Sequence, residues 1–294
     1  MRFRGGGEGR VKAYMFVTPG EYFRGRGLRP RKRWGQHFLN QPATAERIVE
    51  AACLAPSEVV VEIGPGLGAL TRFILPRVGR LHLVELDREL AVFLENHLPA
   101  AECQITLHQE DILAFDFGGL ARREGEPLVV VGNLPYNISS PLIFRLLEVR
   151  DCLKRAVLMV QKEVGQRLSA GPGGKDYGVL SVLLGVYAPV RSLLVVTPGQ
   201  FYPPPQVDSI VVSIDFSDRA GCPEPSFAFL RQVVNTCFQQ RRKTLHNALK
   251  GLAGRLGVRL EEVFRASGID PQRRPETLSP EEFVRLTRAI GLPR

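Results

Sequence analysis

Short apolar runs recur along the first two-thirds of this 294-residue chain, and segments of helical length separate them. Three of the runs, at 58–64, 80–87 and 128–132, read "EVVVEIG", "RLHLVELD" and "LVVVG". Strands that are apolar on both faces and alternate with helices form a parallel sheet that is covered on both sides. The pattern therefore predicts a doubly wound α/β fold. The other expected strands lie near 104–111 and at 155–161, and the expected helices lie near 43–54, from about 69, and over 88–97, 140–148 and 162–168.

The chain changes character in its last third. Runs at 192–201 and 209–216 flank the proline-rich "YPPPQ" and predict an antiparallel pair of strands at the edge of the sheet. Beyond Phe216 the apolar residues follow helical spacing, which predicts a small all-helical domain over 217–294. Residues 1–28 are rich in Gly and Arg and lack apolar periodicity. We therefore expect them to form a flexible basic extension, within which Met15 is a second candidate start.

The positive charge is concentrated at the two ends of the chain. The net charge of +9 divides into +8 over residues 1–33, −5 over 34–215 and +6 over 216–294. A basic protein can use such charge for solubility alone. Neutralising phosphates and releasing their counterions requires clustered charge, so the uneven distribution favours a nucleic-acid partner.

The cysteines and the hydropathy pattern exclude several classes of protein. No pair of cysteines has C-x-x-C spacing, so the sequence predicts neither a metal site nor a disulfide framework and fits a reducing cytoplasm. No apolar stretch approaches the roughly 18 residues that cross a membrane. We expect a cytoplasmic protein without membrane segments or bound metal. The five cysteines are Cys53, Cys103, Cys152, Cys222 and Cys237.

A glycine-rich turn follows the first apolar run. Gly64, Gly66 and Gly68 have G-x-G-x-G spacing, which lets the chain turn tightly and lets a ligand approach the backbone. This spacing differs from the G-x-G-x-x-G of dinucleotide sites, and no GK[ST] follows it, so both NAD or FAD binding and a Walker loop are disfavoured. Glu85 and Asp111 end the next two runs, where carboxylates accept hydrogen bonds from a ribose and from an adenine amine. Together these residues predict an adenosine site, although each acid alone fits a solvated loop.

The run at 128–132 ends in the corner Asn133-Leu134-Pro135-Tyr136. A nucleobase amine is a poor nucleophile, and a site can hold it by accepting both of its hydrogens with the Asn133 side-chain carbonyl and the Leu134 backbone carbonyl. Tyr136 and, from the proline-rich segment, Phe201 are aromatic candidates for stacking on the base. The alternatives are that Asn133 caps the following helix and that Phe201 belongs to an ordinary turn.

Several of these segments carry a resemblance. The chain from about Arg31 to Leu292 resembles the small-subunit ribosomal RNA adenine dimethyltransferases. The motifs, in order, are "RKRWGQHFLN", "VEIGPGLGALT", "VELD", "QEDIL", "GNLPYNISSP", "FYPPPQVDS", "QQRRKTLHNAL" and "RRPETLSPEEF". The first 28 residues precede the usual start of the family, and Trp34 stands where a smaller apolar residue is common.

The resemblance implies a fold and an activity. It implies a Rossmann-like methyltransferase domain over 29–216 and a helical rRNA-binding domain over 217–294. It implies S-adenosylmethionine as the cofactor and dimethylation of two adjacent adenines near the 3′ end of small-subunit rRNA. The partner would be the small ribosomal subunit, and we expect the enzyme to be a monomer. The order of the methyl transfers does not follow from the sequence.

The resemblance also assigns roles to individual residues. Asn133, Leu134, Tyr136 and Phe201 would hold the target adenine, and the basic trio Arg241, Arg242 and Lys243 would meet rRNA phosphates. An exposed helix face is the alternative for the trio. The residues expected to bind the cofactor are Gln36, His37, Leu39, Glu62, Gly64, Gly66, Glu85, Leu86, Asp111, Ile112 and Asn133.

Three other functions compete with this one. The large-subunit adenine methyltransferases that confer macrolide resistance more usually read Asn-Ile-Pro-Tyr at the corner, where this chain has Asn-Leu-Pro-Tyr. A non-catalytic ribosome-assembly or transcription factor would have no physical reason to keep Glu85, Asp111 and Asn133. A nicotinamide dehydrogenase is disfavoured by the glycine spacing.

Overall fold

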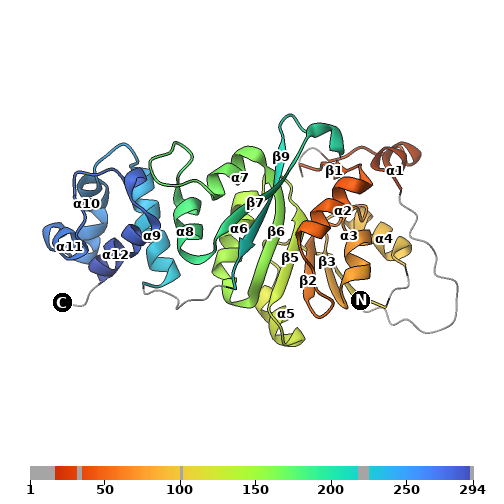
Figure 1. Ribbon diagram of the computed structural model, residues 1–294, viewed down its shortest axis with the longest axis horizontal. Helices are drawn as coiled ribbons and strands as arrows, with labels where there is room; N and C mark the ends of the chain where they lie inside the picture. The colour runs from red at the N-terminus through yellow and green to blue at the C-terminus, as the bar shows by residue number, and fades with distance from the viewer. Residues whose placement is uncertain (1–16, 32–34, 100–101, 218–224, 292–294) are drawn as a thin grey trace. The chain divides into compact units, whose positions relative to one another are not determined.

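The computed structural model describes residues 17–31, 35–99, 102–217 and 225–291 (Figure 1). Its contacts divide the chain into two compact units. The first contains Met1–Gly165 and Arg191–Ser217, and the second contains Gln166–Val190 and Asp218–Arg294. Residues 166–190 therefore group with the C-terminal helices rather than with the sheet.

The first unit is built on a seven-stranded sheet with the order β4-β3-β2-β5-β6-β9-β7. The strands β2 to β6 are mutually parallel, and β9 runs antiparallel to β6. This arrangement confirms the predicted doubly wound α/β fold. β9 separates β6 from β7, so of the two strands predicted at the edge only β7 is outermost. The strand bounds are β2 (Val59–Ile63), β3 (Arg80–Val84), β4 (Gln104–His108), β5 (Leu128–Asn133), β6 (Leu153–Gln161), β7 (Val190–Val196) and β9 (Ser209–Asp215).

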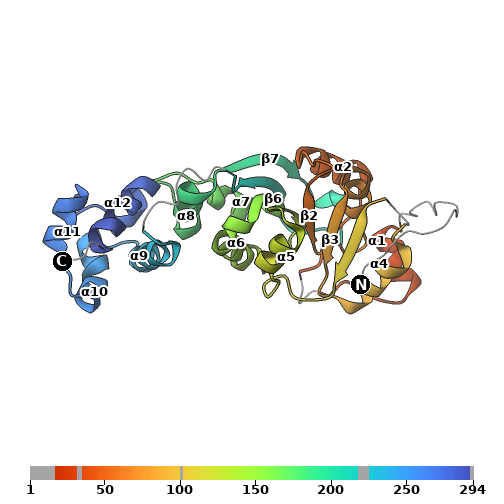
Figure 2. The same cartoon turned by 90° about the horizontal axis from the view of Figure 1, so that it is seen from below.

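Burial on both faces explains why the central strands are mostly apolar. All five residues of β2 are buried, and Val61 pairs with His82 of β3 and with Val130 of β5. α2 (Pro42–Ala51) lies on one side of the sheet, and α5 (Phe117–Glu124) and α6 (Ser139–Glu148) lie on the other (Figure 2). The sequence did not predict α5, because its two glycines weaken the helical pattern. Asp116 starts this helix by accepting a hydrogen bond from the Gly119 backbone N–H.

The helices after β2 and β3, and the helix α7 after β6, can be compared with the predicted ones. The helix expected from about residue 69 is α3 (Thr71–Ile74), and it continues only as a 3₁₀ turn (Leu75–Arg77) that contains Pro76, which has no N–H to donate. α4 (Arg88–His97) begins where the Asp87 carboxylate accepts a hydrogen bond from the Glu89 N–H. α4 has the predicted bounds, and so does α7 (Lys162–Leu168), which crosses from the first unit into the second.

The N-terminal segment differs from the flexible extension that we expected over 1–28. Residues 1–16 lie outside the described residues, but Pro19–Gly25 form the helix α1. Thr18 and Glu21 form a reciprocal capping box at its start, and Tyr22 and Phe23 are buried. The expectation was wrong for this part because a helix of about two turns offers too little periodicity to detect, while its aromatic residues pack on distant segments.

A second, two-stranded sheet lies in the same unit. β1 (Phe38–Leu39) pairs antiparallel with β8 (Phe201–Tyr202), in the register Phe38↔Tyr202 and Leu39↔Phe201. A 3₁₀ turn (Pro198–Gln200) precedes β8. The pairing joins the "GQHFLN" segment to the proline-rich segment, which are far apart in the sequence.

The second unit is helical, as predicted for the C-terminal domain. Thr244 caps α10 by accepting a hydrogen bond from the Asn247 N–H, and glycines in the left-handed conformation end α10 and α11. Among the described residues, no helix is long and apolar enough to cross a membrane. The helices are α8 (Val179–Tyr187), α9 (Phe227–Gln239), α10 (Leu245–Leu256), α11 (Leu260–Ser267) and α12 (Pro280–Gly291), with a 3₁₀ turn at Pro275–Thr277.

Candidate cofactor and substrate site

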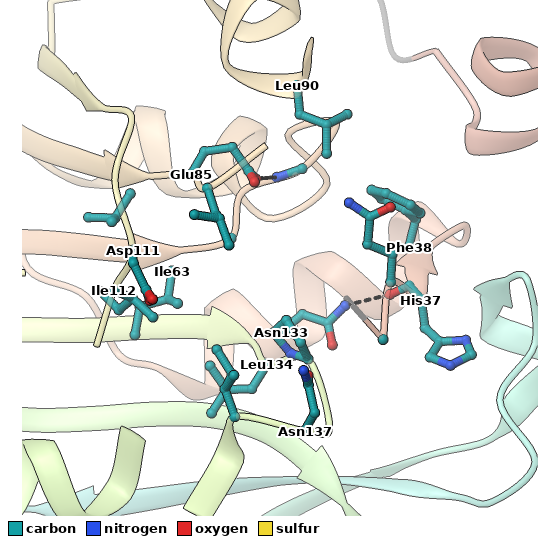
Figure 3. A pocket seen from close by; sticks show the side chains of 18 of the residues that line it. His37, Phe38, Ile63, Glu85, Leu90, Asp111, Ile112, Asn133, Leu134 and Asn137 are labelled. Carbon is teal, nitrogen blue, oxygen red and sulfur yellow. Dashed lines mark hydrogen bonds between the residues drawn. The ribbon is translucent and has the colours of Figure 1, made fainter. Parts of the chain in front are cut away.

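A pocket opens at the carboxyl ends of β2, β3, β4 and β5, where open α/β sheets bind their ligands (Figure 3). It contains about 910 Å³ of empty space, counting the solvent at its mouth. Strand-end residues, the segment at 35–38, the corner after β5 and one residue of α4 form its walls. The lining residues are Gly35, Gln36, His37, Phe38, Ile63, Gly64, Gly66, Val84, Glu85, Leu86, Leu90, Glu110, Asp111, Ile112, Asn133, Leu134, Pro135, Asn137 and Ile138.

The glycine turn forms one wall of the pocket. Gly64 and Gly66 both have φ of +59°, a conformation that side chains disfavour. A Cβ atom on Gly66 would lie 3.1 Å from Cε1 of Phe38. The turn therefore requires glycine at Gly66 both for its backbone conformation and for the close approach of an aromatic ring.

Glu85 ties the end of β3 to this turn. Its Oε2 accepts a hydrogen bond from the Gly66 N–H at 3.0 Å, and its Oε1 accepts one from the Asp87 N–H at 2.8 Å. Burial raises the pKa of Glu85 to about 7. The carboxyl group is held on both oxygens at the pocket wall, where each oxygen keeps a lone pair for a ligand hydroxyl.

Glu62 lies behind the turn rather than in the main pocket. Thr71 Oγ1 donates a hydrogen bond of 2.7 Å to Glu62 Oε2, and burial raises the pKa of this carboxyl to about 8. Glu62 and Leu39 line a smaller cavity that shares Phe38, Gly64, Gly66 and Asn133 with the main pocket. The glycine turn thus lies between Glu62 and Leu39 on one side and the main pocket on the other.

Apolar and acidic side chains form the wall after β3 and β4. Leu86 is 50% exposed although it is a large apolar residue, and Ile112 is buried. Asp111 Oδ1 accepts a hydrogen bond from the Leu113 N–H at 2.9 Å, which fixes the carboxylate beside Ile112. Figure 3 places Glu85 and Asp111 at one end of the pocket and His37 and Asn133 at the other. An apolar surface with a carboxylate at its margin suits the flat face and the amine of an adenine.

The Asn133 corner forms the other end. The Asn133 Nδ2 atom donates a hydrogen bond of 2.8 Å to the backbone carbonyl of His37. The N–H of Leu134 donates to Met159 O at 3.0 Å, and the Leu134 side chain is buried. The alternative in which Asn133 caps the next helix is wrong, because α6 begins at Ser139 with Ile138 as its N-cap residue. With Nδ2 engaged, the Asn133 Oδ1 atom is the acceptor of this amide.

Tyr136 is fixed beside the pocket but does not line it. Its hydroxyl is 2.9 Å from Ser209 Oγ, and its ring centroid lies 5.3 Å from that of His37 at an interplanar angle of 28°. The His37 ring is also fixed by a hydrogen bond, since its Nδ1 atom lies 2.8 Å from the carbonyl oxygen of Pro203. Burial raises the pKa of Tyr136, so the hydroxyl stays protonated at neutral pH. The two rings form a fixed stack next to Asn133.

Phe201, which we expected to stack on the target base, lies in the core rather than at the pocket. Its ring is 4% exposed and belongs to the main hydrophobic core, and it lies outside the set of residues that line the pocket. The reason is strand pairing, because the register Leu39↔Phe201 between β1 and β8 turns both side chains inward.

The segment before β1 contributes residues that the sequence identified only in part. Gln36 accepts a hydrogen bond from the Arg31 N–H at 2.8 Å through Oε1, and its Nε2 donates to Asp87 Oδ2 at 3.3 Å. Motif reasoning missed Phe38 and Leu90. Phe38 follows His37 in the same motif, which was a usable signal, whereas only the fold brings Leu90 of α4 to the pocket.

The basic trio of the second unit separates into two kinds of residue. Arg241 forms an ion pair of 2.5 Å with Glu276 and donates hydrogen bonds to the carbonyls of Lys175 and Gly174 at 2.8 and 2.9 Å. Arg242 and Lys243 are exposed. The Arg241 guanidinium is thus engaged within its own unit, and contact of the three side chains with rRNA phosphates stays a prediction.

Comparison with known proteins identifies the family. Residues 27–291 match the family described as "Ribosomal RNA adenine dimethylase". The chain belongs to this family. The family uses S-adenosylmethionine, and the chain is accordingly an S-adenosylmethionine-dependent rRNA adenine dimethyltransferase. Among the described residues, no group of three His, Cys, Asp or Glu side chains stands where it would hold a metal ion.

Curated relatives and solved structures agree with the family. The ribosomal RNA small subunit methyltransferases A of Nitrosococcus oceani and Syntrophotalea carbinolica are 48% and 47% identical over 262 residues, which is 89% of this chain and 96% and 97% of theirs. A dimethyladenosine transferase from Plasmodium falciparum superposes with a TM-score of 0.70 at 26% identity, covering 85% of this chain and 96% of its own. The 23S rRNA methyltransferase ErmE does so with a TM-score of 0.61 at 26% identity, covering 87% and 100%.

Proposed function

We propose that this member of the family dimethylates the N6 amines of two adjacent adenines near the 3′ end of small-subunit rRNA, and that Asn133 holds each amine. The observation that carries the proposal is the hydrogen bond from Asn133 Nδ2 to the His37 carbonyl. This bond fixes the orientation of the amide and leaves Oδ1 as an acceptor at the pocket wall. The site lies where the cofactor and an extruded base would have to meet.

The residues of the pocket fit S-adenosylmethionine. Glu85 offers acceptors for ribose hydroxyls, and Leu86, Asp111 and Ile112 form an apolar surface with a carboxylate at its edge. Gly64 and Gly66 expose backbone beside them. When bound, the cofactor supplies a methyl group on a positively charged sulfur. We propose that Gln36 and His37, at the opposite wall, border its methionine end, and that Glu62 and Leu39 support the turn from behind.

The corner residues would then act on the adenine. The Asn133 Oδ1 atom and the Leu134 carbonyl would each accept one amine hydrogen, which directs the nitrogen lone pair away from them and toward the cofactor. Tyr136, held by Ser209 and packed on His37, would offer its ring to the base. The proton released after methyl transfer would pass to water, so the residues position the amine rather than titrate it.

The helical unit would bind the rRNA outside the target base. We propose that residues 217–294 contact phosphates through exposed cations such as Arg242 and Lys243. Arg241 instead holds the segment at 174–175 in place. The enzyme would act as a cytoplasmic monomer on the small ribosomal subunit.

Two other functions remain as competitors. The likeness to ErmE favours a large-subunit substrate as the second candidate. The curated relatives at 47% and 48% identity carry the small-subunit name and cover nearly their whole length, so we prefer the small subunit. A non-catalytic assembly factor is a weaker candidate, because the acceptors at Glu85, Asp111 and Asn133 are all in place.

The test is methyl incorporation from labelled S-adenosylmethionine into ribosomal subunits that lack the modification. We expect label on small-subunit adenines, none on large subunits, and loss of most label with Asn133→Ala. Label on the large subunit would favour the resistance-type activity. Cofactor binding without label on either subunit would favour the non-catalytic factor.

A further inference from the structure

The helix α1 carries an aromatic cluster that lies against the cofactor pocket. Tyr22 and Phe23 are buried, and the Tyr22 ring meets Phe93 of α4 edge-on, with centroids 5.0 Å apart. The Arg26 guanidinium lies 4.4 Å from the centroid of the Tyr22 ring. A seven-residue helix has little stability of its own in water, so these contacts must hold α1 in place.

The cluster reaches both the main pocket and the smaller cavity behind the turn. It includes Leu67 of the glycine turn, Leu90 of α4 and Phe38 of β1. Leu90 and Phe38 line the main pocket, and Leu67 and Phe38 line the smaller cavity behind the turn. These three residues come from segments that are separate in the sequence, so an element packed against all of them fixes their mutual positions.

Phe38 connects the cluster to the reacting end of the site. Its ring lies 5.2 Å from that of Phe23, and its Cε1 atom lies 3.1 Å from the position of a Cβ on Gly66. Phe38 also follows His37, whose carbonyl accepts the hydrogen bond from Asn133. A shift of Phe38 would therefore move both the glycine turn and the group that orients the Asn133 amide.

We propose that α1 is a positioning element for cofactor binding and for methyl transfer, and that Phe23 is its positioning residue. α1 precedes residue 27, where the match to the family begins. Phe23 lines neither the main pocket nor the smaller cavity. It acts by holding Phe38 against Gly66 and keeping the His37 carbonyl in place. The inference rests on the proposed cofactor site.

The experiment uses the full chain with single substitutions. Phe23→Ala removes the ring beside Phe38, and Phe23→Leu keeps most of the volume. Phe117→Ala is the matched control, because Phe117 is a fully buried phenylalanine of α5 in the same unit and lies outside the pocket lining. The measurements are the Kd for S-adenosylmethionine by calorimetry, the Tm, kcat and KM on ribosomal subunits, and amide hydrogen exchange at 36–39 and 64–67.

We expect Phe23→Ala to raise the Kd about tenfold and to lower kcat about tenfold, because a loosened site loses preorganisation. Hydrogen exchange should become faster at 36–39 and 64–67. Phe117→Ala should lower the Tm but leave the Kd within about twofold of the original. Phe23→Leu should give an intermediate Kd, about threefold weaker.

Two results would overturn the inference. One is a Phe23→Ala protein with an unchanged Kd and unchanged exchange at 36–39. The other is an equal loss of affinity in Phe117→Ala, which would reduce the effect to general stability. If Phe23→Ala does not fold, the Kd of Phe23→Leu for S-adenosylmethionine serves as the test. An unchanged Kd in Phe23→Leu would then refute the positioning role of Phe23. Failure of the original chain to bind S-adenosylmethionine would instead refute the proposed function.

Discussion

The side-chain amide of Asn133, at the end of β5, donates its hydrogen bond to the backbone carbonyl of His37 across 2.8 Å. The two residues are separated by 96 positions in the sequence. This contact fixes the orientation of the amide, because Nδ2 donates to the protein and Oδ1 remains available to accept a hydrogen bond from a ligand. It also shows why the "GQHFLN" segment and the "GNLPYN" corner belong to one site.

The first prediction concerns the two functions of the Asn133 amide. Asn133→Asp keeps an oxygen for the adenine amine but replaces the Nδ2 donor with an acceptor that faces the His37 carbonyl. Asn133→Ala removes both groups. We expect kcat to fall by about 10²-fold or more in both variants, while the Kd for S-adenosylmethionine changes less than about fivefold. Single-turnover methylation and calorimetry measure these quantities. Full activity of Asn133→Ala would contradict the proposed mechanism.

The second prediction concerns the glycine turn. Gly66→Ala would place a methyl group 3.1 Å from Phe38 and impose a positive φ on alanine, which costs about 1–2 kcal/mol from the backbone alone. We expect weaker cofactor binding and a lower Tm. Gly257→Ala is the matched control, since Gly257 has φ of +67° with no atom within 4 Å of a Cβ and lies in the helical unit. It should lower the Tm and leave the Kd for S-adenosylmethionine unchanged. An unchanged Kd in Gly66→Ala would show that the turn does not shape the pocket.

The third prediction concerns pH and the buried carboxyl of Glu62. Its pKa is raised by burial to about 8, so it holds a proton in the folded state where the unfolded chain, at 4.5, has lost it. Folding is therefore favoured by Glu62 below about pH 4.5, and this contribution is lost as the pH rises toward 8. We expect the free energy of unfolding to fall less between pH 5.5 and 8 in Glu62→Gln than in the original protein, by at least about 1 kcal/mol.

Urea unfolding of ligand-free protein at both pH values measures this difference. Comparing the two proteins cancels the opposite contribution of His82, whose pKa burial lowers to about 4. The glutamine amide keeps an acceptor for the Thr71 hydroxyl. Identical pH dependence in the two proteins would show that Glu62 is ionised in the folded state.

The fourth prediction separates the basic trio. Arg241→Ala removes an ion pair with Glu276 and two hydrogen bonds to backbone carbonyls, so we expect it to lower stability by about 1–3 kcal/mol. Arg242→Ala and Lys243→Ala should leave the Tm unchanged and weaken rRNA binding. Each should reduce the slope of log K against log salt by about 1, because each removes one cation that meets a phosphate.

Thermal unfolding measures the Tm of each variant, and binding to small-subunit rRNA at several salt concentrations measures its affinity and salt slope. Arg241→Lys is a useful control, since a lysine keeps the charge but cannot reach Glu276 and two carbonyls with one planar group. If Arg241→Lys keeps the original Tm, charge alone is sufficient at this position. A stable Arg241→Ala with reduced rRNA affinity would restore Arg241 to the phosphate contacts.

The sheet and the edge at which the site lies follow from local sequence patterns. Apolar runs alternating with helical segments specify parallel strands, and parallel strands bring their carboxyl ends to one edge. Glu85, Asp111 and Asn133 end their runs, so their meeting follows from local pattern and topology. The same reasoning works for the helical C-terminal part, because helical spacing is a local property.

Contacts between distant segments set which side chains face the pocket and which are engaged elsewhere. Phe201 belongs to the core because of its partner in β1, and Arg241 is occupied by groups at 174–175 and 276. The short helix α1 is held by aromatic contacts with distant segments. The direction of a side chain depends on pairing with residues far away in the sequence, and composition and periodicity carry no record of that pairing.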